Sequence, residues 1–185
     1  MKLLNIILII LIALTNEIKA DSKNQLFEKL QKGGNLIFIR HAYAPGNGDP
    51  DNFDIKDCST QRNLSDSGRK QSEKIGSFFY ENKIPIDLVI SSEWCRCKET
   101  ALIAFDKFKT KDFLNSFYSS KFAKNKKIQM LNLKKYIDNW NEDKNLVLIT
   151  HYVVISEVLN YAPSSGEIVV SDKNFRIIGN IEIDY

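Results

Sequence analysis

The sequence is poor in the residues that hold metal ions and that build disulfide frameworks. Its 185 residues include only two histidines, His41 and His151, and three cysteines, Cys58, Cys95 and Cys97. Two distant histidines and one Cys-x-Cys pair do not make a zinc-ligand set, so we predict no metal site and no cofactor. The cysteines leave two alternatives open: a disulfide from Cys58 to Cys95 or Cys97 with one free thiol, or three small buried side chains.

An excess of charge of one sign is also missing. The formal net charge is +3, which is too small to argue for a nucleic-acid partner. The longest basic cluster, residues 121–127, is expected to be a solvated surface segment, as most charge runs are. We therefore predict no binding to nucleic acid.

Long hydrophobic runs are restricted to the N-terminus. The run over residues 3–14 follows Lys2, and Ala20 supplies a small residue before Asp21. At about 12 residues the run is shorter than the ~20 that a membrane-spanning helix needs, which favours a cleaved signal peptide over a permanent anchor. We predict a signal peptide over 1–20 with cleavage after Ala20, a periplasmic or secreted protein without membrane attachment, and one domain over 21–185.

The remaining sequence alternates predicted helices and strands. Periodicity and breakers predict helices over 21–31, 65–82, 95–105, 134–140 and 153–161, strands over 35–40, 87–90 and 146–150, a short strand over 128–131, and a hairpin over 167–183. Such alternation predicts an α/β fold. We expect a three-layer sandwich, with a mixed, mainly parallel sheet, helices on both faces and a C-terminal antiparallel hairpin. The long polar loop over 43–63 is of a length that is often functional.

Arginine and histidine follow the predicted parallel strands. Arg40 and His41 end the first strand, Arg96 follows the second, and His151 follows the third. The carboxyl ends of parallel strands meet at one edge of the sheet, where open α/β folds bind ligands. A phosphoryl group needs forked cationic donors and an in-line nucleophile, which suits Arg40, Arg96 and a neutral His41. His151 would stabilise the charge that develops on the phosphoryl oxygens.

The same segments resemble the histidine phosphatase superfamily, the phosphoglycerate-mutase-like proteins. Residues 36–42 are similar to its Arg-His-Gly signature, 63–71 to the segment that opens the next helix, 91–101 to its second motif, and 148–151 to the strand before its second histidine. The resemblance covers residues 35–160. Residues 57–62 and the Cys-Arg-Cys run are similar to an exported subgroup.

The resemblance implies a mixed sheet of about five or six strands flanked by helices. It also implies that Arg40, Arg96 and His151 form the phosphate pocket and that His41 is the residue that is phosphorylated. On the loop, Gln61 and Arg62 are candidate substrate contacts, although Arg62 could instead pair with a local carboxylate.

Two positions depart from the superfamily pattern. Ala42 stands where glycine is usual, and its methyl group carries a conformational penalty only if φ is positive. No general acid is identified, because Tyr152 follows His151 in place of aspartate, and Asn115 falls near the place of the usual glutamate. Asn115 is kept as a third candidate substrate contact. Asp112 is nearby, and Asp51 and Asp54 of the long loop could reach the site, but each is expected to be a solvated loop carboxylate.

The predicted function is hydrolysis of a small phosphomonoester, phosphoanhydride or phosphohistidine through a phosphohistidine on His41. General acid help is worth about 10²–10⁴-fold, so the protein is expected either to favour leaving groups that are already stable or to have a relocated acid. Ala42 and Asn115 motivate one alternative, a catalytically weak or inactive phosphate-binding module. A second alternative is a structural envelope protein held by an uncleaved N-terminal helix. The sequence makes no prediction of oligomeric state.

Overall fold

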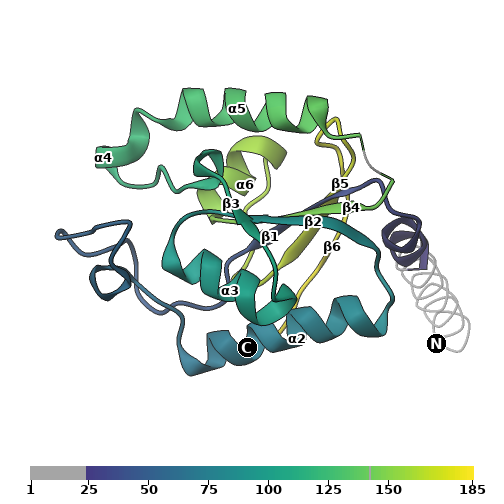
Figure 1. Ribbon diagram of the computed structural model, residues 1–185, viewed down its shortest axis with the longest axis horizontal. Helices are drawn as coiled ribbons and strands as arrows, with labels where there is room; N and C mark the ends of the chain where they lie inside the picture. The colour runs from purple at the N-terminus through teal and green to yellow at the C-terminus, as the bar shows by residue number, and fades with distance from the viewer. Residues whose placement is uncertain (1–23, 142) are drawn as a thin grey trace, which may run out of the picture.

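A mixed sheet of six strands forms the centre of the computed structural model, which describes residues 24–141 and 143–185 (Figure 1). The strand order is β3-β2-β4-β1-β5-β6. The strands are β1 (Leu36–Arg40), β2 (Ile86–Ser91), β3 (Lys109–Thr110), β4 (Asn145–Thr150), β5 (Ile168–Ser171) and β6 (Ile177–Ile181). Neighbours from β3 to β1 run parallel, whereas β5 and β6 add an antiparallel hairpin beside β1.

Helices cover both faces of this sheet, so the predicted fold class is confirmed. Residues 24–32, α2 (Asp66–Glu81) and α3 (Cys95–Phe105) lie on one face, and α5 (Lys126–Asn139) and α6 (Tyr152–Leu159) lie on the other (Figure 1). Three short helices lie in the connections: η1 (Cys58–Thr60), η2 (Asp112–Leu114) and α4 (Ser120–Ala123). The predicted helix cap is present, because the hydroxyl of Ser65 accepts a hydrogen bond from the Gly68 N–H at 3.1 Å.

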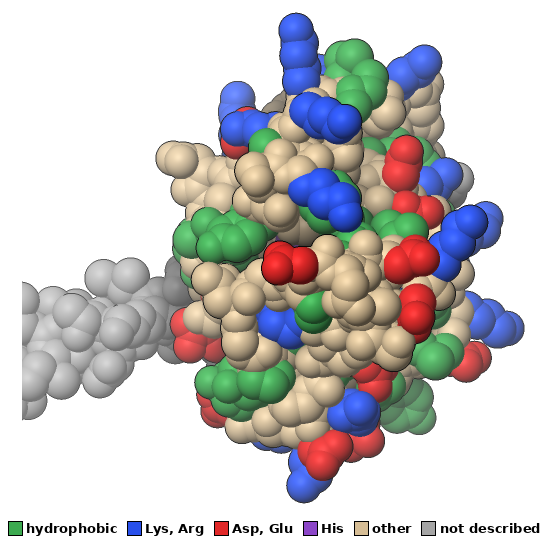
Figure 2. All heavy atoms as spheres, turned by 90° about the vertical axis from the view of Figure 1, so that its left-hand side faces the viewer, with side chains coloured by type: hydrophobic (Ala, Val, Ile, Leu, Met, Phe, Trp, Pro, Cys, Tyr) green, Lys and Arg blue, Asp and Glu red, His purple; other side chains and the backbone are tan. Residues whose placement is uncertain are grey.

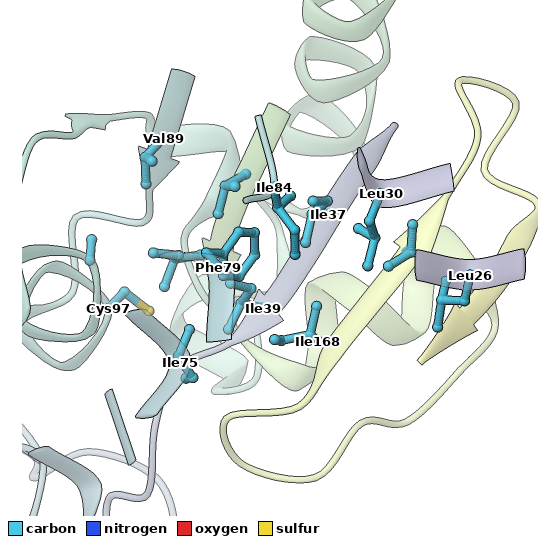
Figure 3. Packing of buried hydrophobic residues seen from close by; sticks show 14 of the residues in the cluster. Leu26, Leu30, Ile37, Ile39, Ile75, Phe79, Ile84, Val89, Cys97 and Ile168 are labelled. Atoms are coloured by element: carbon cyan, nitrogen blue, oxygen red, sulfur yellow. The ribbon is translucent and has the colours of Figure 1, made fainter. Parts of the chain in front are cut away.

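The central strands are buried on both sides because their side chains alternate between two apolar cores. In β1, Ile37 and Ile39 join the core beneath α2 and α3, while Leu36 and Phe38 join the core beneath α5 and α6. Figure 3 shows the first of these cores, in which Ile75 and Phe79 of α2 pack toward Ile39. Burial on both faces fixes the register of β1, and hence the point at which its last residues leave the sheet.

The short strand predicted over 128–131 is wrong, since these residues belong to α5. In this helix Gln129, Leu133 and Ile137 are buried at helical spacing, while Ile128 and Leu131 are 53% and 61% exposed. A segment of four residues with three apolar ones is too short to distinguish the two periods, and the polar Gln129 supplies the first inward position.

The predicted signal peptide over 1–20 lies outside the described residues. Within residues 24–141 and 143–185, no helix is both long enough and apolar enough to cross a bilayer.

Candidate active site

The two histidines meet where the parallel strands end. His41 follows β1 and His151 follows β4, and the His41 N–H donates to the Thr150 carbonyl at 2.9 Å across the two strands. Their ring centroids are 5.4 Å apart. Both rings are almost fully buried, at 2% and 3% exposure, and no histidine surface is visible on the face over the 43–63 loop (Figure 2).

His41 has the geometry of a nitrogen nucleophile. Its Nδ1 lies 2.8 Å from the Ala42 carbonyl oxygen, which can only accept, so we assign the ring proton to Nδ1 and the lone pair to Nε2. Burial, and then the charge of Arg96, hold the pKa of His41 well below 6.5. The imidazole is therefore neutral at pH 7, as nucleophilic attack requires. Ala42 does not have a positive φ, so its methyl group carries no conformational penalty.

A chain of hydrogen bonds orients His151. Arg96 Nη2 lies 3.4 Å from His151 Nδ1, so this nitrogen accepts and Nε2 carries the proton. Nε2 lies 3.0 Å from the Ser92 hydroxyl, which in turn donates to Asn115 Oδ1 at 3.0 Å. Burial and then the charge of Arg96 also hold the pKa of His151 well below its usual value. His151 thus presents Nδ1 to the same guanidinium that contacts His41.

Three arginines line the cavity around these rings, and the volume of this cavity is about 270 Å³. Arg96, from the first turn of α3, donates through Nε to His41 Nε2 at 3.2 Å. Arg40 donates Nη1 to the Pro163 carbonyl at 2.9 Å, and its buried Nε has no partner among the described residues. Arg62 donates Nε to the Gly48 carbonyl at 2.8 Å and Nη1 to the Ala44 carbonyl. Arg62 therefore pairs with backbone carbonyls, not with the local carboxylate that the sequence offered as an alternative.

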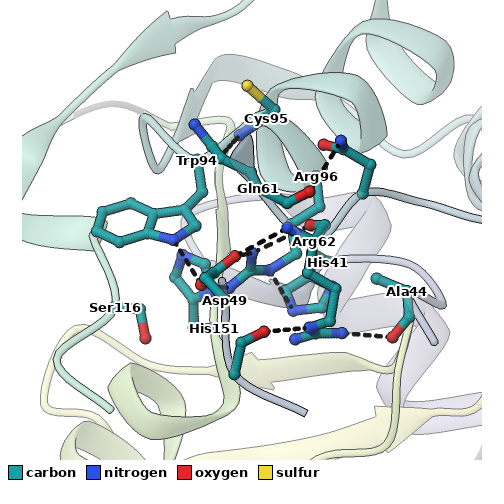
Figure 4. Close-up of polar contacts among 12 residues, drawn as sticks. His41, Ala44, Asp49, Gln61, Arg62, Trp94, Cys95, Arg96, Ser116 and His151 are labelled. Atoms are coloured by element: carbon teal, nitrogen blue, oxygen red, sulfur yellow. Dashed lines mark hydrogen bonds and ion pairs between the residues drawn. The ribbon is translucent and has the colours of Figure 1, made fainter. Parts of the chain in front are cut away.

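The structure brings together the predicted residues Arg40, His41, Arg96 and His151 in the lining of one cavity, with Arg62 beside them. Figure 4 shows His41, His151 and Arg96 close together. Gln61 and Asn115, expected as substrate contacts, do not line this cavity. Gln61 accepts from the Cys95 N–H at 2.9 Å and donates to two carbonyls of its own loop, at Asp54 and Ile55.

The side-chain amide of Asn115 is also engaged by neighbouring groups, through both its oxygen and its nitrogen. Its oxygen accepts from Ser92 and from the Glu93 N–H, and its nitrogen donates to the Glu93 carboxylate at 2.7 Å. Neither residue therefore lines the cavity. Gln61 instead links its loop to the start of α3, and Asn115 links the end of η2 to the segment after β2.

Asp49 is a site residue that the sequence did not single out. Its carboxylate accepts from Arg96 Nη1 at 2.6 Å and Nη2 at 3.2 Å, from Trp94 Nε1 at 3.1 Å and from the Arg62 N–H at 3.1 Å (Figure 4). Burial acts to raise the pKa of Asp49, but the hydrogen bonds and charge of Arg96 outweigh it and hold this pKa below the usual value. The available signal was the presence of Gly46 and Gly48 just before Asp49, and both glycines adopt a positive φ in the structure.

A disulfide fixes this loop to the helix that carries Arg96. Of the alternatives left open by the sequence, the structure contains the pair Cys58–Cys95, with Cα atoms 5.7 Å apart, and Cys97 is free and buried. Burial raises the pKa of the Cys97 thiol to about 12, so it stays protonated. Among the residues that the structure describes, no cluster of His, Cys, Asp or Glu is placed to hold a metal ion.

Comparison with known proteins shows the fold. No family model matches this sequence, and no curated protein matches it by sequence. The protein histidine phosphatase SixA, in a complex with tungstate, matches at a TM-score of 0.56 and 14% identity over 81% of this chain and 96% of its own. A mycobacterial glucosyl-3-phosphoglycerate phosphatase in complex with VO3 matches at 0.56 and 13% identity, over 75% of this chain and 92% of its own.

The protein TTHB049 from Thermus thermophilus matches at a TM-score of 0.57 and 14% identity, over 81% of this chain and 99% of its own. Each of these matches covers most of this chain and most of the matched chain. The resemblance found in the sequence motifs agrees with them. The chain has the histidine phosphatase fold.

Proposed function

We propose that this protein is a phosphatase that hydrolyses small phosphorylated molecules through a phosphohistidine on His41. One observation supports this most strongly: a neutral imidazole whose Nε2 carries a lone pair lies among three arginines and a second imidazole in one cavity. Such a cavity attracts a dianion and places a nucleophile at phosphorus. The α3 and α6 helices also begin beside it, and helix N-termini favour anions.

In the first step His41 Nε2 attacks phosphorus. The N–P bond forms, the bond from phosphorus to the leaving oxygen breaks, and Arg40, Arg62 and Arg96 bind the phosphoryl oxygens as their charge redistributes. Arg96 must first release His41 Nε2, because its Nε–H occupies that lone pair at 3.2 Å. His151 faces the same oxygens, and a nearby dianion favours its protonated, donating form.

In the second step a water molecule attacks the phosphohistidine. The O–P bond forms, the N–P bond breaks, and His41 returns to the neutral state that its buried position favours. Phosphate leaves the cavity, and Arg96 can again contact His41. The cycle needs only water besides the phosphorylated substrate.

The cavity favours a small substrate with an apolar or aromatic leaving group. Its volume of about 270 Å³ is near the lower end for small-molecule sites. Aromatic side chains form much of its wall: Phe53, Trp94, Tyr118, Phe122 and Tyr152. These rings can pack on a leaving group that extends from the cationic end of the cavity.

Hydrolysis of p-nitrophenyl phosphate by the wild-type protein and His41→Ala tests this proposal. We expect kcat to fall by about 10³-fold or more in the variant, because removing a nucleophile removes the covalent route. Equal rates in the two folded proteins would refute the role of His41.

The alternative is a phosphate-binding module without turnover. It is favoured by the contacts of Arg96, which covers His41 Nε2 and pairs with Asp49. Titration calorimetry with inorganic phosphate and vanadate separates the two functions. Binding by a wild-type protein that hydrolyses no phosphoester would establish the module.

We also propose an exported location. The apolar N-terminal run and the Cys58–Cys95 disulfide support it, since disulfides persist in oxidising compartments. Mass spectrometry of the native protein tests whether Asp21 is its first residue. A protein that retains Met1 at its N-terminus would contradict cleavage.

A further inference from the structure

The carboxylate of Asp49 lies inside the cationic cavity, although it comes from the long loop between β1 and α2. Its side chain is 15% exposed, and four hydrogen bonds from Arg96, Trp94 and Arg62 hold it there. A carboxylate with so many donors has a fixed position relative to the rings of His41 and His151. What this carboxylate can do is argued on the basis of the proposed phosphatase function.

Arg96 is shared between the nucleophile and this carboxylate. Its Nε donates to His41 Nε2 at 3.2 Å, while Nη1 and Nη2 donate to Asp49 at 2.6 and 3.2 Å (Figure 4). A phosphoryl group that reaches His41 Nε2 must present its oxygens to the same guanidinium. The Asp49 carboxylate therefore occupies N–H donors of Arg96 that a phosphoryl oxygen would also need.

Competition for Arg96 changes the protonation of Asp49. Arg96 is the partner that keeps this carboxylate ionised, while burial acts in the opposite direction. When a phosphoryl dianion takes the donors of Arg96, Asp49 loses that partner, stays largely buried and gains a negatively charged neighbour. Each of these three changes favours the protonated carboxyl group.

We propose that Asp49 is the general acid that protonates the leaving oxygen. A phosphomonoester has a second pKa near 6, so its monoanion can bring the proton that Asp49 accepts on binding. As the His41 N–P bond forms and the P–O bond breaks, Asp49 passes this proton to the leaving oxygen and becomes a carboxylate. In the second step the carboxylate takes a proton from the attacking water, and the protonated state is restored.

Other carboxylates considered from the sequence are less well placed. Asp54 accepts from the Lys56 N–H within its own loop, and Asp112 lines a different cavity. Asp51 lines the same cavity as Asp49 but is exposed, and none of the described hydrogen bonds or ion pairs of Arg96 is made to it. Asp51 is therefore the rival position for the test.

The role of Asp49 extends the substrate class. Without proton donation, only esters with stable leaving groups are hydrolysed quickly. With Asp49 as acid, the same cavity can hydrolyse ordinary alkyl phosphomonoesters, whose alkoxide leaves slowly unless it is protonated.

Asp49→Asn tests this through the dependence of rate on the leaving group. The substrates are 2,4-dinitrophenyl, p-nitrophenyl and phenyl phosphate and β-glycerophosphate. We expect kcat/KM to fall by about 10²–10⁴-fold for β-glycerophosphate and by less than about tenfold for the dinitrophenyl ester, which needs no acid. The same fold-loss on all four substrates, or no loss on any, would overturn the role of Asp49.

Asp51→Asn is the matched control, since it removes the same charge two residues away. A leaving-group-dependent loss in this variant, and not in Asp49→Asn, would move the acid to Asp51 and overturn the inference. A second readout needs no variant: the wild-type protein should show a solvent deuterium isotope effect on kcat/KM, which reports the first step alone, with β-glycerophosphate but not with the dinitrophenyl ester. Equal isotope effects would also overturn it.

The activated ester separates the two proposals. If wild-type protein and Asp49→Asn both hydrolyse dinitrophenyl phosphate and show the same dependence on leaving group, only the role of Asp49 fails. If the wild-type protein hydrolyses none of the esters, the phosphatase function fails, and the inference fails with it.

Discussion

Arg96 is the residue on which the other site residues converge. Its guanidinium contacts His41, His151 and Asp49 through different nitrogens, at 3.2, 3.4 and 2.6 Å. A planar fork can make these contacts together because its donors point in fixed, different directions. A lysine ammonium would keep the charge but could not reproduce the geometry.

Arg96→Lys should therefore lower kcat/KM for p-nitrophenyl phosphate by about 10²-fold, the value of roughly two charge-assisted hydrogen bonds. Steady-state kinetics at pH 7 measure the effect. Arg69→Lys is the control, because Arg69 forms half-exposed ion pairs with Asp66 and Glu99 on α2 and α3. A loss of the same size in both variants would contradict a specific role for the fork of Arg96.

Site residues that lie directly at strand ends can be predicted from the sequence. Site residues that a loop carries into the cavity cannot. Arg40, His41 and His151 could be placed because parallel strands share one carboxyl edge. Asp49 could not be placed, because it lies in a loop without periodicity and is 47 positions away in the sequence from its partner Arg96. Its position depends on turns and on the Cys58–Cys95 disulfide, neither of which has a local sequence pattern that fixes the contact.

At the scale of elements, the site depends on close packing between α2 and α3. Gly76 of α2 faces the backbone of α3, and a Cβ atom placed there would lie 2.6 Å from the Ala104 carbonyl oxygen. Backbone atoms cannot move aside as flexible side chains do, so the two helices can approach this closely only at a glycine. The helix packed in this way carries Arg96 in its first turn.

Gly76→Ala should lower the free energy of unfolding by about 1–3 kcal/mol, since the overlap outweighs the better helix propensity of alanine. Urea denaturation followed by circular dichroism measures it. The exposed neighbour Ser77 provides the control, and Ser77→Ala should change stability by less than about 0.5 kcal/mol. Stabilisation of the Gly76 variant would contradict the close approach of the helices.

Elements with a strong apolar pattern could be predicted, and elements positioned by tertiary contacts could not. The strands β1, β2 and β4 are apolar runs of buried sheet, and all three were predicted to within two residues at each end. The two-residue strand β3 and the four-residue helix α4 carry too few residues for a period to show. Their conformations follow from the neighbours on which they pack.

At the scale of the whole molecule, both histidines of the chain are buried in one cationic cavity. The folded protein keeps their pKa values well below 6.5, whereas the unfolded chain has the ordinary value. Between the lowered pKa and 6.5, the unfolded state therefore binds more protons than the folded state. Stability is full above pH 6.5 and is lost as the pH falls below it.

The free energy of unfolding should fall by about 2.5 kcal/mol between pH 7 and pH 5.5, roughly equally from the two histidines. Chemical denaturation at several pH values measures the slope. Carboxylates titrate mostly below this range, so the two histidines dominate it. A constant stability from pH 7 to pH 5.5 would contradict neutral burial of both rings.

The residue that carries the phosphoryl group decides whether His41 is the nucleophile. The protein is mixed with 2,4-dinitrophenyl phosphate, quenched rapidly in alkali, which preserves phosphohistidine, digested, and mapped by tandem mass spectrometry. We expect phosphate on His41 in the wild-type protein and none in His41→Ala. Phosphate on a different residue, or hydrolysis without any phosphorylated His41, would contradict this role of His41.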